Sequence, residues 1–358
     1  GRLPQVKGVM KGEGEETFAE LCLRYTEAGG YSADEESRAD RRLEDVQGIT
    51  YRNTRCEIND NPWREAIELS KVPFVYQDME NFKNKIIYYE SSRGCPFSCS
   101  YCLSSIDKHL RFRDINLVKK ELQFFIDHEV PQVKFVDRTF NCKHDHAAAI
   151  WRYIAEHDKG ITNFHFEVAA DILNDEEIDL LTSMRPGLVQ LEIGVQSTNP
   201  ETIRAIRRVM DFAKVRNAVE KIRKAGNIHQ HLDLIAGLPF EGADSFAKSF
   251  DDVYSLRPEQ LQLGFLKVLK GSGMELQKDE YGLAYQSSPP YEVLFTRWLS
   301  FEDVIRLKGI EEMAEAYYNS GQFAYTLKEL GKKYPSAFAM YDNLNRFYEA
   351  RGYGGQQH

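Results

Sequence analysis

Three cysteines crowd into eight residues of this sequence, in the stretch GCPFSCSYC that begins at Gly94. Cys95, Cys99 and Cys102 are spaced by four and then three residues, which is also the spacing of one helix face. The pattern therefore allows two interpretations, a buried apolar stripe or the ligands of a metal. Gly94 and Pro96 flank the first cysteine, and both residue types are unfavourable inside a helix. We predict a loop that presents three thiols.

Three roles for these cysteines can be compared: disulfide bonds, a zinc site and an iron–sulfur cluster. Disulfides would leave an odd cysteine, and six cysteines in 358 residues are too sparse for a disulfide scaffold. Structural zinc needs a fourth ligand, and His109, the nearest candidate, has an unpersuasive spacing. Thiolates are soft ligands suited to iron–sulfur clusters, and a cubane cluster ordinarily takes four of them. Three thiolates would leave one iron open, which favours a reactive site. The other cysteines, Cys22, Cys56 and Cys142, are expected to be isolated buried thiols.

The elements that must position the loop form a regular series. Short apolar segments alternate with amphipathic ones, which is typical of βα units around a parallel sheet. The expected strands are 85–91, 130–137, 163–169, 188–197, 228–239 and 260–269, and the expected helices are 115–129, 144–157, 174–184, 199–206, 213–226 and 244–256. Six consecutive units predict an α/β fold, a partial TIM-like (β/α)6 barrel, with the cysteine loop directly after its first strand.

Polar residues alternate with apolar ones along three of these strands. In a barrel the polar set would face the interior, near the strand ends where barrel ligands bind. This set comprises His165, Glu167, Glu192, Gln196, His231 and Asp233. Buried carboxylates need partners, so they either form structural networks with residues such as Arg208 or hold a polyhydroxyl, cationic ligand. Their position beside the cysteine loop favours the ligand.

The chain around the barrel is expected to have three further parts. Residues 1–46 would end an N-terminal domain and its charged linker YSADEESRADRRLEDV, 47–85 would connect to the barrel at 86–275, and 276–358 would be a helical extension with a frayed GGQQH tail. The GEGEET stretch is a poor phosphate loop because its acids would repel phosphate, but they suit a helix N-terminus. The first residue is glycine rather than methionine, which suggests a trimmed or partial chain.

Bulk properties restrict the partners. A formal net charge of −9 works against a broad grip on nucleic acid or an anionic membrane. We find no apolar run of the roughly 18 residues that a membrane span needs, and no signal peptide. We expect a cytoplasmic protein whose partner is a small molecule or a peptide, with nucleic acid unfavoured.

The stretch GCPFSCSYC resembles the CxxxCxΦC signature of the radical S-adenosylmethionine superfamily, with Tyr101 as the aromatic residue. The resemblance implies a [4Fe-4S] cluster on the three cysteines, S-adenosylmethionine on the fourth iron, and a reducing partner such as flavodoxin or ferredoxin. LEIGVQS and LDLIAGLP are similar to segments of oxygen-independent coproporphyrinogen oxidases. That similarity assigns cofactor contacts to Glu167, Gln196, Arg208 and Asp233, alongside the inward Glu192. Where many members carry a GGE turn this chain has VDRTFN, in which Asp137, Thr139 and Asn141 are the candidate substitutes.

The phrases YYESSRGCPFSCSYCLSS, VKFVDRTFN and LQLGFLKVLKG resemble a subgroup that carries a cobalamin-binding domain and an uncharacterised C-terminal extension. VKGVMKGEGEETFAELC is similar to the last strand, turn and helix of that doubly wound cobalamin domain, so a remnant of it is expected at the N-terminus. Cobalamin is implied by this resemblance alone.

The resemblance leaves three classes of function. The first is a cobalamin-linked radical enzyme that methylates, rearranges or cyclises a carbon centre, with the cofactors supplying the chemistry. The second is a cobalamin-independent radical oxidase or a modifier of peptide or RNA. The third is a non-enzymatic iron–sulfur electron carrier or scaffold, which would have to account for the inward polar set without a ligand.

Overall fold

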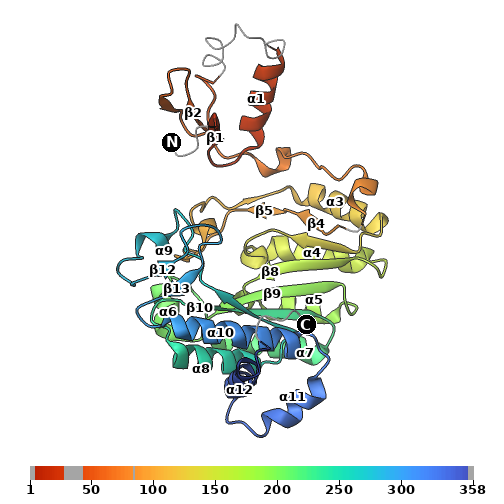
Figure 1. Ribbon diagram of the computed structural model, residues 1–358. Coiled ribbons are helices and arrows are strands. Elements are labelled where there is room, and N and C mark those ends of the chain that lie inside the picture. Colours follow the sequence, from red (N-terminus) through yellow and green to blue (C-terminus); the bar gives the residue numbers. More distant parts are fainter. Residues whose placement is uncertain (1–4, 28–42, 84, 354–358) are drawn as a thin grey trace. The chain divides into compact units, whose positions relative to one another are not determined.

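The computed structural model describes residues 5–27, 43–83 and 85–353. The chain divides into two compact units, Gly1–Val75 and Tyr76–His358 (Figure 1). The finer boundaries expected from the sequence, at residues 46, 85 and 275, stay predictions. Most of the expected charged linker and the GGQQH tail lie outside the described residues. Among the described helices none is long and apolar enough to cross a membrane.

The N-terminal unit contains a small antiparallel sheet and one helix. Strand β2 (Ile49–Arg52) lies between β1 (Gly8–Met10) and β3 (Ile58–Asp60), and helix α1 spans Glu15–Glu27. The GEGEET acids Glu15 and Glu16 occupy the first turn of α1, as expected from the helix dipole. Leu43 and Val46 are buried in the core of this unit, so the end of the expected linker is packed rather than solvated.

The second unit is built on a six-stranded sheet in which every neighbouring pair is parallel. Its spatial order is β11-β10-β9-β8-β7-β4, the reverse of the sequence order, as in an open (β/α)6 barrel. This confirms the predicted fold. The strands are β4 (Ile87–Tyr89), β7 (Gln132–Phe135), β8 (Asn163–Val168), β9 (Val189–Gln196), β10 (His229–Ala236) and β11 (Gln260–Phe265).

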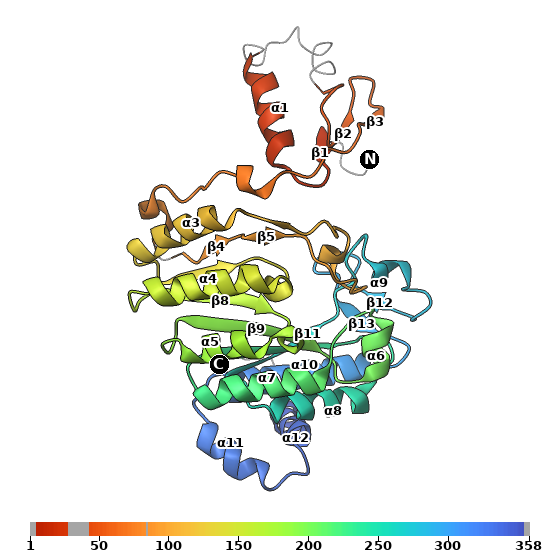
Figure 2. The same cartoon turned by 180° about the vertical axis from the view of Figure 1, so that it is seen from behind.

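Amphipathic helices cover the outer face of this sheet (Figure 2). Their apolar sides pack on the alternate apolar residues of the strands, including the fully buried Phe164, Phe166 and Leu191. Asp114 and Asp211 start two of the helices by accepting hydrogen bonds from the first-turn amides. The covering helices are α3 (Ile115–Asp127), α4 (His144–His157), α5 (Asp175–Ser183), α6 (Pro200–Ala205), α7 (Phe212–Ala225) and α8 (Ala243–Tyr254).

The C-terminal extension contains one short antiparallel pair, β12 (Ala284–Tyr285) and β13 (Val293–Phe295). The rest of it is largely helical, as expected, and packs beside the last strand of the barrel. Its helices are α10 (Phe301–Ala314), α11 (Ala324–Gly331) and α12 (Ala337–Ala350), with a π-helical turn, η7, over Glu315–Asn319. The amide of Asn319 accepts from Leu261 N at 2.9 Å and donates to Leu261 O at 3.0 Å. This side chain thus satisfies the backbone of β11 at the open edge of the sheet. Phe250 of α8 stacks edge-on against Phe338 and Tyr341 of α12.

The expectation for the three isolated cysteines was wrong in part. Cys22 and Cys56 are exposed, and Cys142 is half-buried. Cys56 lies in the turn between β2 and β3 with a left-handed φ of 64°, and Cys22 lies on the solvent side of α1. Cysteine is usually buried. Cys22 and Cys56 are exposed because one lies on the solvent side of a helix and the other in a surface turn.

Candidate functional site

The cysteine loop connects two short strands, β5 (Ser92–Arg93) and β6 (Arg111–Phe112), which pair antiparallel. Backbone hydrogen bonds attach the loop to distant parts of the barrel. Ser100 N donates to Ile206 O at 2.9 Å, and Met274 N of the short helix α9 (Gly273–Leu276) donates to Ser100 O at 2.7 Å. The loop is therefore held at a defined position without being part of a helix, as the sequence predicted.

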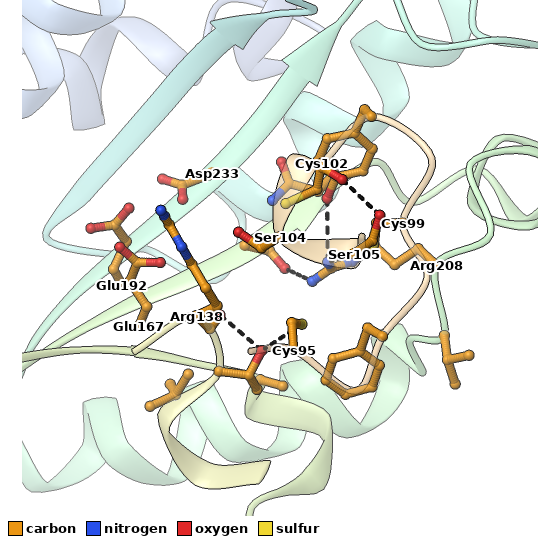
Figure 3. A pocket seen from close by; sticks show the side chains of 18 residues that line it. Cys95, Cys99, Cys102, Ser104, Ser105, Arg138, Glu167, Glu192, Arg208 and Asp233 are labelled. Atoms are coloured by element: carbon orange, nitrogen blue, oxygen red, sulfur yellow. Dashed lines mark hydrogen bonds between the residues drawn. The ribbon is translucent and has the colours of Figure 1, made fainter. Parts of the chain in front are cut away.

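The loop forms one wall of a cavity of about 240 Å³ at the carboxyl ends of the barrel strands (Figure 3). All but two of the residues predicted to bind metal or cofactor line this cavity. They come from the cysteine loop, from the segments after β7 and α6, and from β8, β9 and β10. They are Cys95, Cys99, Tyr101, Cys102, Thr139, Glu167, Glu192, Gln196, Arg208 and Asp233.

Arg208 links the cysteine loop to β9. Its guanidinium donates to the backbone oxygen of Gly194 and lies 3.9 Å from Cys99 Sγ and 3.4 Å from the Tyr101 hydroxyl. Burial raises the pKa of the Cys99 thiol, whereas the positive charge of Arg208 opposes this rise. The Nε of Arg208 is buried and has no hydrogen-bond partner among the described residues. A cation is thus held next to the thiols with donor capacity left over.

Gln196 has an unusual backbone. Its φ is 71°, in the left-handed region, at an irregularity in the pairing of β9 with β10. A Cβ added at Gly194 would lie 2.3 Å from Gln196 Nε2, so a side chain at position 194 would displace the amide of Gln196. Local strain of this kind is found at binding sites, where it re-aims a side chain.

Three carboxylates face the cavity from adjacent strands, Glu167 on β8, Glu192 on β9 and Asp233 on β10 (Figure 3). The Glu192 Oε2 atom lies 3.0 Å from His165 Nε2 and 3.1 Å from Lys134 Nζ. The hydrogen bond from His165 and the charge of Lys134 lower the Glu192 pKa to about 2 despite its burial. Glu192 is therefore an anion at any physiological pH.

Glu167 differs from Glu192 because no described residue forms a hydrogen bond or ion pair with it. Burial and repulsion by Glu192 raise its pKa to about 7. Asp233 is intermediate: burial raises its pKa, while His231, 3.0 Å away, opposes the rise. Asp233 Oδ1 and His231 Nε2 form this ion pair without hydrogen-bond geometry, so both remain unsatisfied hydrogen-bonding atoms.

The raised pKa of Glu167 predicts a stability change with a definite sign. The native carboxyl keeps its proton up to about pH 7, but in the unfolded chain it ionises near 4.5, so stability falls as the pH rises between these values. We expect Glu167→Gln to be more stable than the unmodified protein at pH 8, by at most about 3 kcal/mol. The advantage should disappear below about pH 4.5. Urea unfolding of the ligand-free protein at several pH values measures this difference.

Glu192→Gln is the matched control, because the pKa of Glu192 is displaced in the opposite direction. Its ionised form stabilises the native state above the unfolded pKa, so this variant should be less stable at pH 8. If both variants change stability with the same sign at pH 8, the assigned environments of the two carboxyls are wrong.

Two side chains predicted on the segment after β7 lie outside the cavity. Asp137 is fully buried and accepts hydrogen bonds from Ser91 N at 3.0 Å, Ser91 Oγ at 2.7 Å and Ser92 Oγ at 2.5 Å. Asn141 bonds both backbone groups of Ala169. Both side chains therefore stabilise backbone, and of the three residues predicted on this segment only Thr139 reaches the cavity, where its hydroxyl lies 3.9 Å from Cys95 Sγ.

Sequence reasoning missed Arg138, which lines the cavity between the cysteine loop and the carboxylates (Figure 3). Its positive charge partly opposes the rise of the Glu167 pKa. Strand alternation gave no signal for it, because β7 ends at Phe135 and Arg138 lies in the turn beyond the strand. Phe97, Ser104, Ser105 and Val209 also line the cavity and carry no recognisable pattern.

The donor set fits an iron–sulfur cluster better than a single ion. All three thiols are free. Among the described residues no three His, Cys, Asp or Glu side chains converge on one point as a single metal ion requires. A four-iron cluster takes each thiolate on a different iron, so its ligands surround a volume. The unsatisfied Arg208 Nε and Asp233 Oδ1 leave hydrogen-bonding capacity for a second, polar ligand in the same cavity.

Fold and site together define a class: a partial parallel barrel with a three-cysteine loop after its first strand and carboxylates at the strand ends. Residues 89–253 match the model of the Radical SAM superfamily, and residues 279–358 match a family described as a protein of unknown function, DUF4080. The chain therefore contains a radical S-adenosylmethionine domain followed by an extension of uncharacterised function. Both had been predicted from resemblance. Enzymes of this superfamily use a [4Fe-4S] cluster and S-adenosylmethionine, act on a substrate and need a reductant.

Similar proteins include an uncharacterised methyltransferase of Pyrococcus horikoshii, 25% identical over 70% of this chain and 55% of the relative. The cobalamin-dependent radical SAM methyltransferase TokK of Streptomyces tokunonensis is 26% identical over 78% of this chain and 42% of the relative. This chain thus spans about half the length of these relatives.

Two solved structures share the fold. The radical S-adenosylmethionine methyltransferase TsrM of Kitasatospora setae, with cobalamin and a [4Fe-4S] cluster bound, has a TM-score of 0.61 at 16% identity, covering 80% of this chain and 59% of TsrM. The cobalamin-dependent radical enzyme OxsB with aqua-cobalamin has a TM-score of 0.63 at 15% identity, covering 91% of this chain and 52% of OxsB.

Proposed function

We propose that this protein is a radical S-adenosylmethionine enzyme in which Cys95, Cys99 and Cys102 hold a [4Fe-4S] cluster and the adjoining cavity binds S-adenosylmethionine. The observation that carries the proposal is the position of the cysteine loop, which shares one cavity with three carboxylates and a buried arginine. When bound and reduced, the cluster supplies the electron that splits S-adenosylmethionine into methionine and a 5′-deoxyadenosyl radical.

The side chains around the cavity have complementary roles in this proposal. Arg208 can pair with the methionyl carboxylate through its unsatisfied donor. Gln196 and Asp233 can bind ribose hydroxyls, and the carboxylates together favour a sulfonium cation. Tyr101 and Phe97 line the same cavity as the thiols, and their aromatic surface would help to exclude water from the reacting centre.

We further infer that the complete enzyme uses cobalamin and alkylates, rearranges or cyclises a carbon centre of a small molecule or peptide. The supporting fact is that TokK, TsrM and OxsB are cobalamin-dependent or cobalamin-bound. The unit Gly1–Val75, with its strand, GEGEET turn and helix, would be the end of the cobalamin-binding domain. Free thiols suit a reducing compartment, so we infer a cytoplasmic location with flavodoxin or ferredoxin as electron donor.

Anaerobic reconstitution with iron and sulfide tests the proposal. We expect about four irons per chain and, after reduction with S-adenosylmethionine present, release of 5′-deoxyadenosine. A cluster that never cleaves S-adenosylmethionine would instead support an electron carrier. Cobalamin copurifying with the longest natural form would separate the cobalamin-linked enzyme from a cobalamin-independent oxidase or peptide-modifying enzyme.

A further inference from the structure

Three side chains, Lys134, His165 and His231, contact the carboxylates of the cavity and have been assigned no function. We refer to these three side chains as the layer. We propose that Lys134, His165 and His231 are positioning residues that keep Glu192 and Asp233 anionic, so that the cavity selects a sulfonium cation over its neutral thioether. This inference rests on the proposed function, because it concerns the binding of S-adenosylmethionine at the same site.

The barrel register places Lys134 and His165 one step deeper than Glu167 and Glu192, whereas His231 lies level with Glu192 and one step deeper than Asp233. Lys134 of β7 pairs in register with His165 of β8, and His231 of β10 pairs with Glu192 of β9. His165 and His231 are buried, with 8% and 9% of their side chains exposed. The two histidines are therefore shielded from solvent, and charge interactions are stronger in such a buried environment than in water. Lys134 is partly exposed, at 26% of its side chain.

The contacts leave the carboxylates available to a ligand. Lys134 and His165 both bind Oε2 of Glu192, and no described residue donates to Oε1. Likewise His231 lies beside Oδ1 of Asp233, and no described residue binds Oδ2. The negative charge of each acid is thus stabilised by contacts at one carboxylate oxygen. The other oxygen has no partner among the described residues and is available to a ligand in the cavity.

Other charged groups around these acids are few. They are Glu167 from β8, Arg138 after β7, Arg208 after α6, and His229 at the exposed start of β10. The neighbours on β11, Gln260 and Gln262, are uncharged. Without the layer, Glu192 and Asp233 would repel each other and Glu167 in a buried space, and burial would favour their protonated forms.

The test compares binding of S-adenosylmethionine with binding of S-adenosylhomocysteine, which lacks the positive charge at sulfur. Calorimetry on the cluster-loaded, unreduced protein gives the ratio of the two affinities at pH 8 and pH 6 without any turnover. We expect His165→Gln with His231→Gln to retain the ratio at pH 8, where the acids are still ionised. At pH 6 the ratio should fall about tenfold further in this variant than in the unmodified protein. A rise of roughly one unit in the pKa of the acids would produce an effect of this size.

His229→Gln is the matched control, since His229 lies on the same strand but contacts neither acid, and it should behave as the unmodified protein. Lys134→Gln, which changes a partly exposed side chain, provides a second variant if the histidine pair is not tolerated, and should change the ratio in the same direction. An unchanged ratio at both pH values in these variants would overturn the inference. Failure of the unmodified protein to bind either ligand would instead overturn the proposed function.

Discussion

Alanine in place of Cys95, Cys99 or Cys102 is expected to abolish iron incorporation and reduce 5′-deoxyadenosine formation to background, while the protein remains folded. Each thiol would supply one of only three protein ligands, and a cluster held by two thiolates on an open cavity is readily lost. Cys95 and Cys99 are buried, but all three cysteines lie on a loop that lines a cavity, so we expect truncation to alanine to leave the strands and helices of the barrel intact. Iron and sulfide analysis, the cluster absorption band and product chromatography measure the effect.

Cys142→Ala is the matched control for these variants. Cys142 lies close enough to Cys95 for their charges to interact, but it does not line the cavity. We expect it to retain full iron content and cleavage activity. Normal iron and cleavage in all three loop variants, or loss of iron in Cys142→Ala alone, would contradict the assignment of the cluster ligands.

Gly94→Ala is expected to have the second largest effect, although it adds a single methyl group. Gly94 has a φ of 95°, and a Cβ there would lie 2.6 Å from the backbone oxygen of His109. A side chain in this backbone region costs about 1–2 kcal/mol even without a clash. Because the clash is with backbone, the cysteine loop itself must move, and we expect iron incorporation to fall severely.

Gly160→Ala separates the two contributions. Gly160 also has a left-handed φ, 83°, but an added Cβ meets no atom within 4 Å. This control should lower the urea midpoint modestly and leave iron content unchanged. If Gly94→Ala binds iron as well as Gly160→Ala does, the close approach of Gly94 to His109 is not needed to position the thiols.

Much of the barrel could be predicted because its signals are local. Apolar residues such as Phe164 and Phe166 recur every second position in strands, and those of α3 recur with helical spacing, so each element is specified by its own sequence. Sequential βα units then leave few arrangements for the sheet. Strand alternation also predicted that Glu167, Glu192 and Asp233 share the interior face, and the structure brings all three to one cavity.

The segment after β7 could not be predicted in the same way. Residue type alone made Asp137 and Asn141 candidates, because an acid and an amide can both bind a cofactor. In the structure their hydrogen bonds are taken by Ser91, Ser92 and Ala169, which are distant in sequence. Nothing local distinguishes a carboxylate that binds a ligand from one that supports a backbone turn.

The donor chemistry of this protein can be read from short segments, because the cysteine spacing, the flanking glycine and proline and the inward acids are all local features. The charge of those acids depends on contacts made in the folded protein. Glu167 and Glu192 are the same residue type at neighbouring positions in one sheet, yet the pKa of one is about 7 and that of the other about 2. The difference arises because His165 and Lys134 contact Glu192 alone, and such contacts exist only when separate strands are brought together.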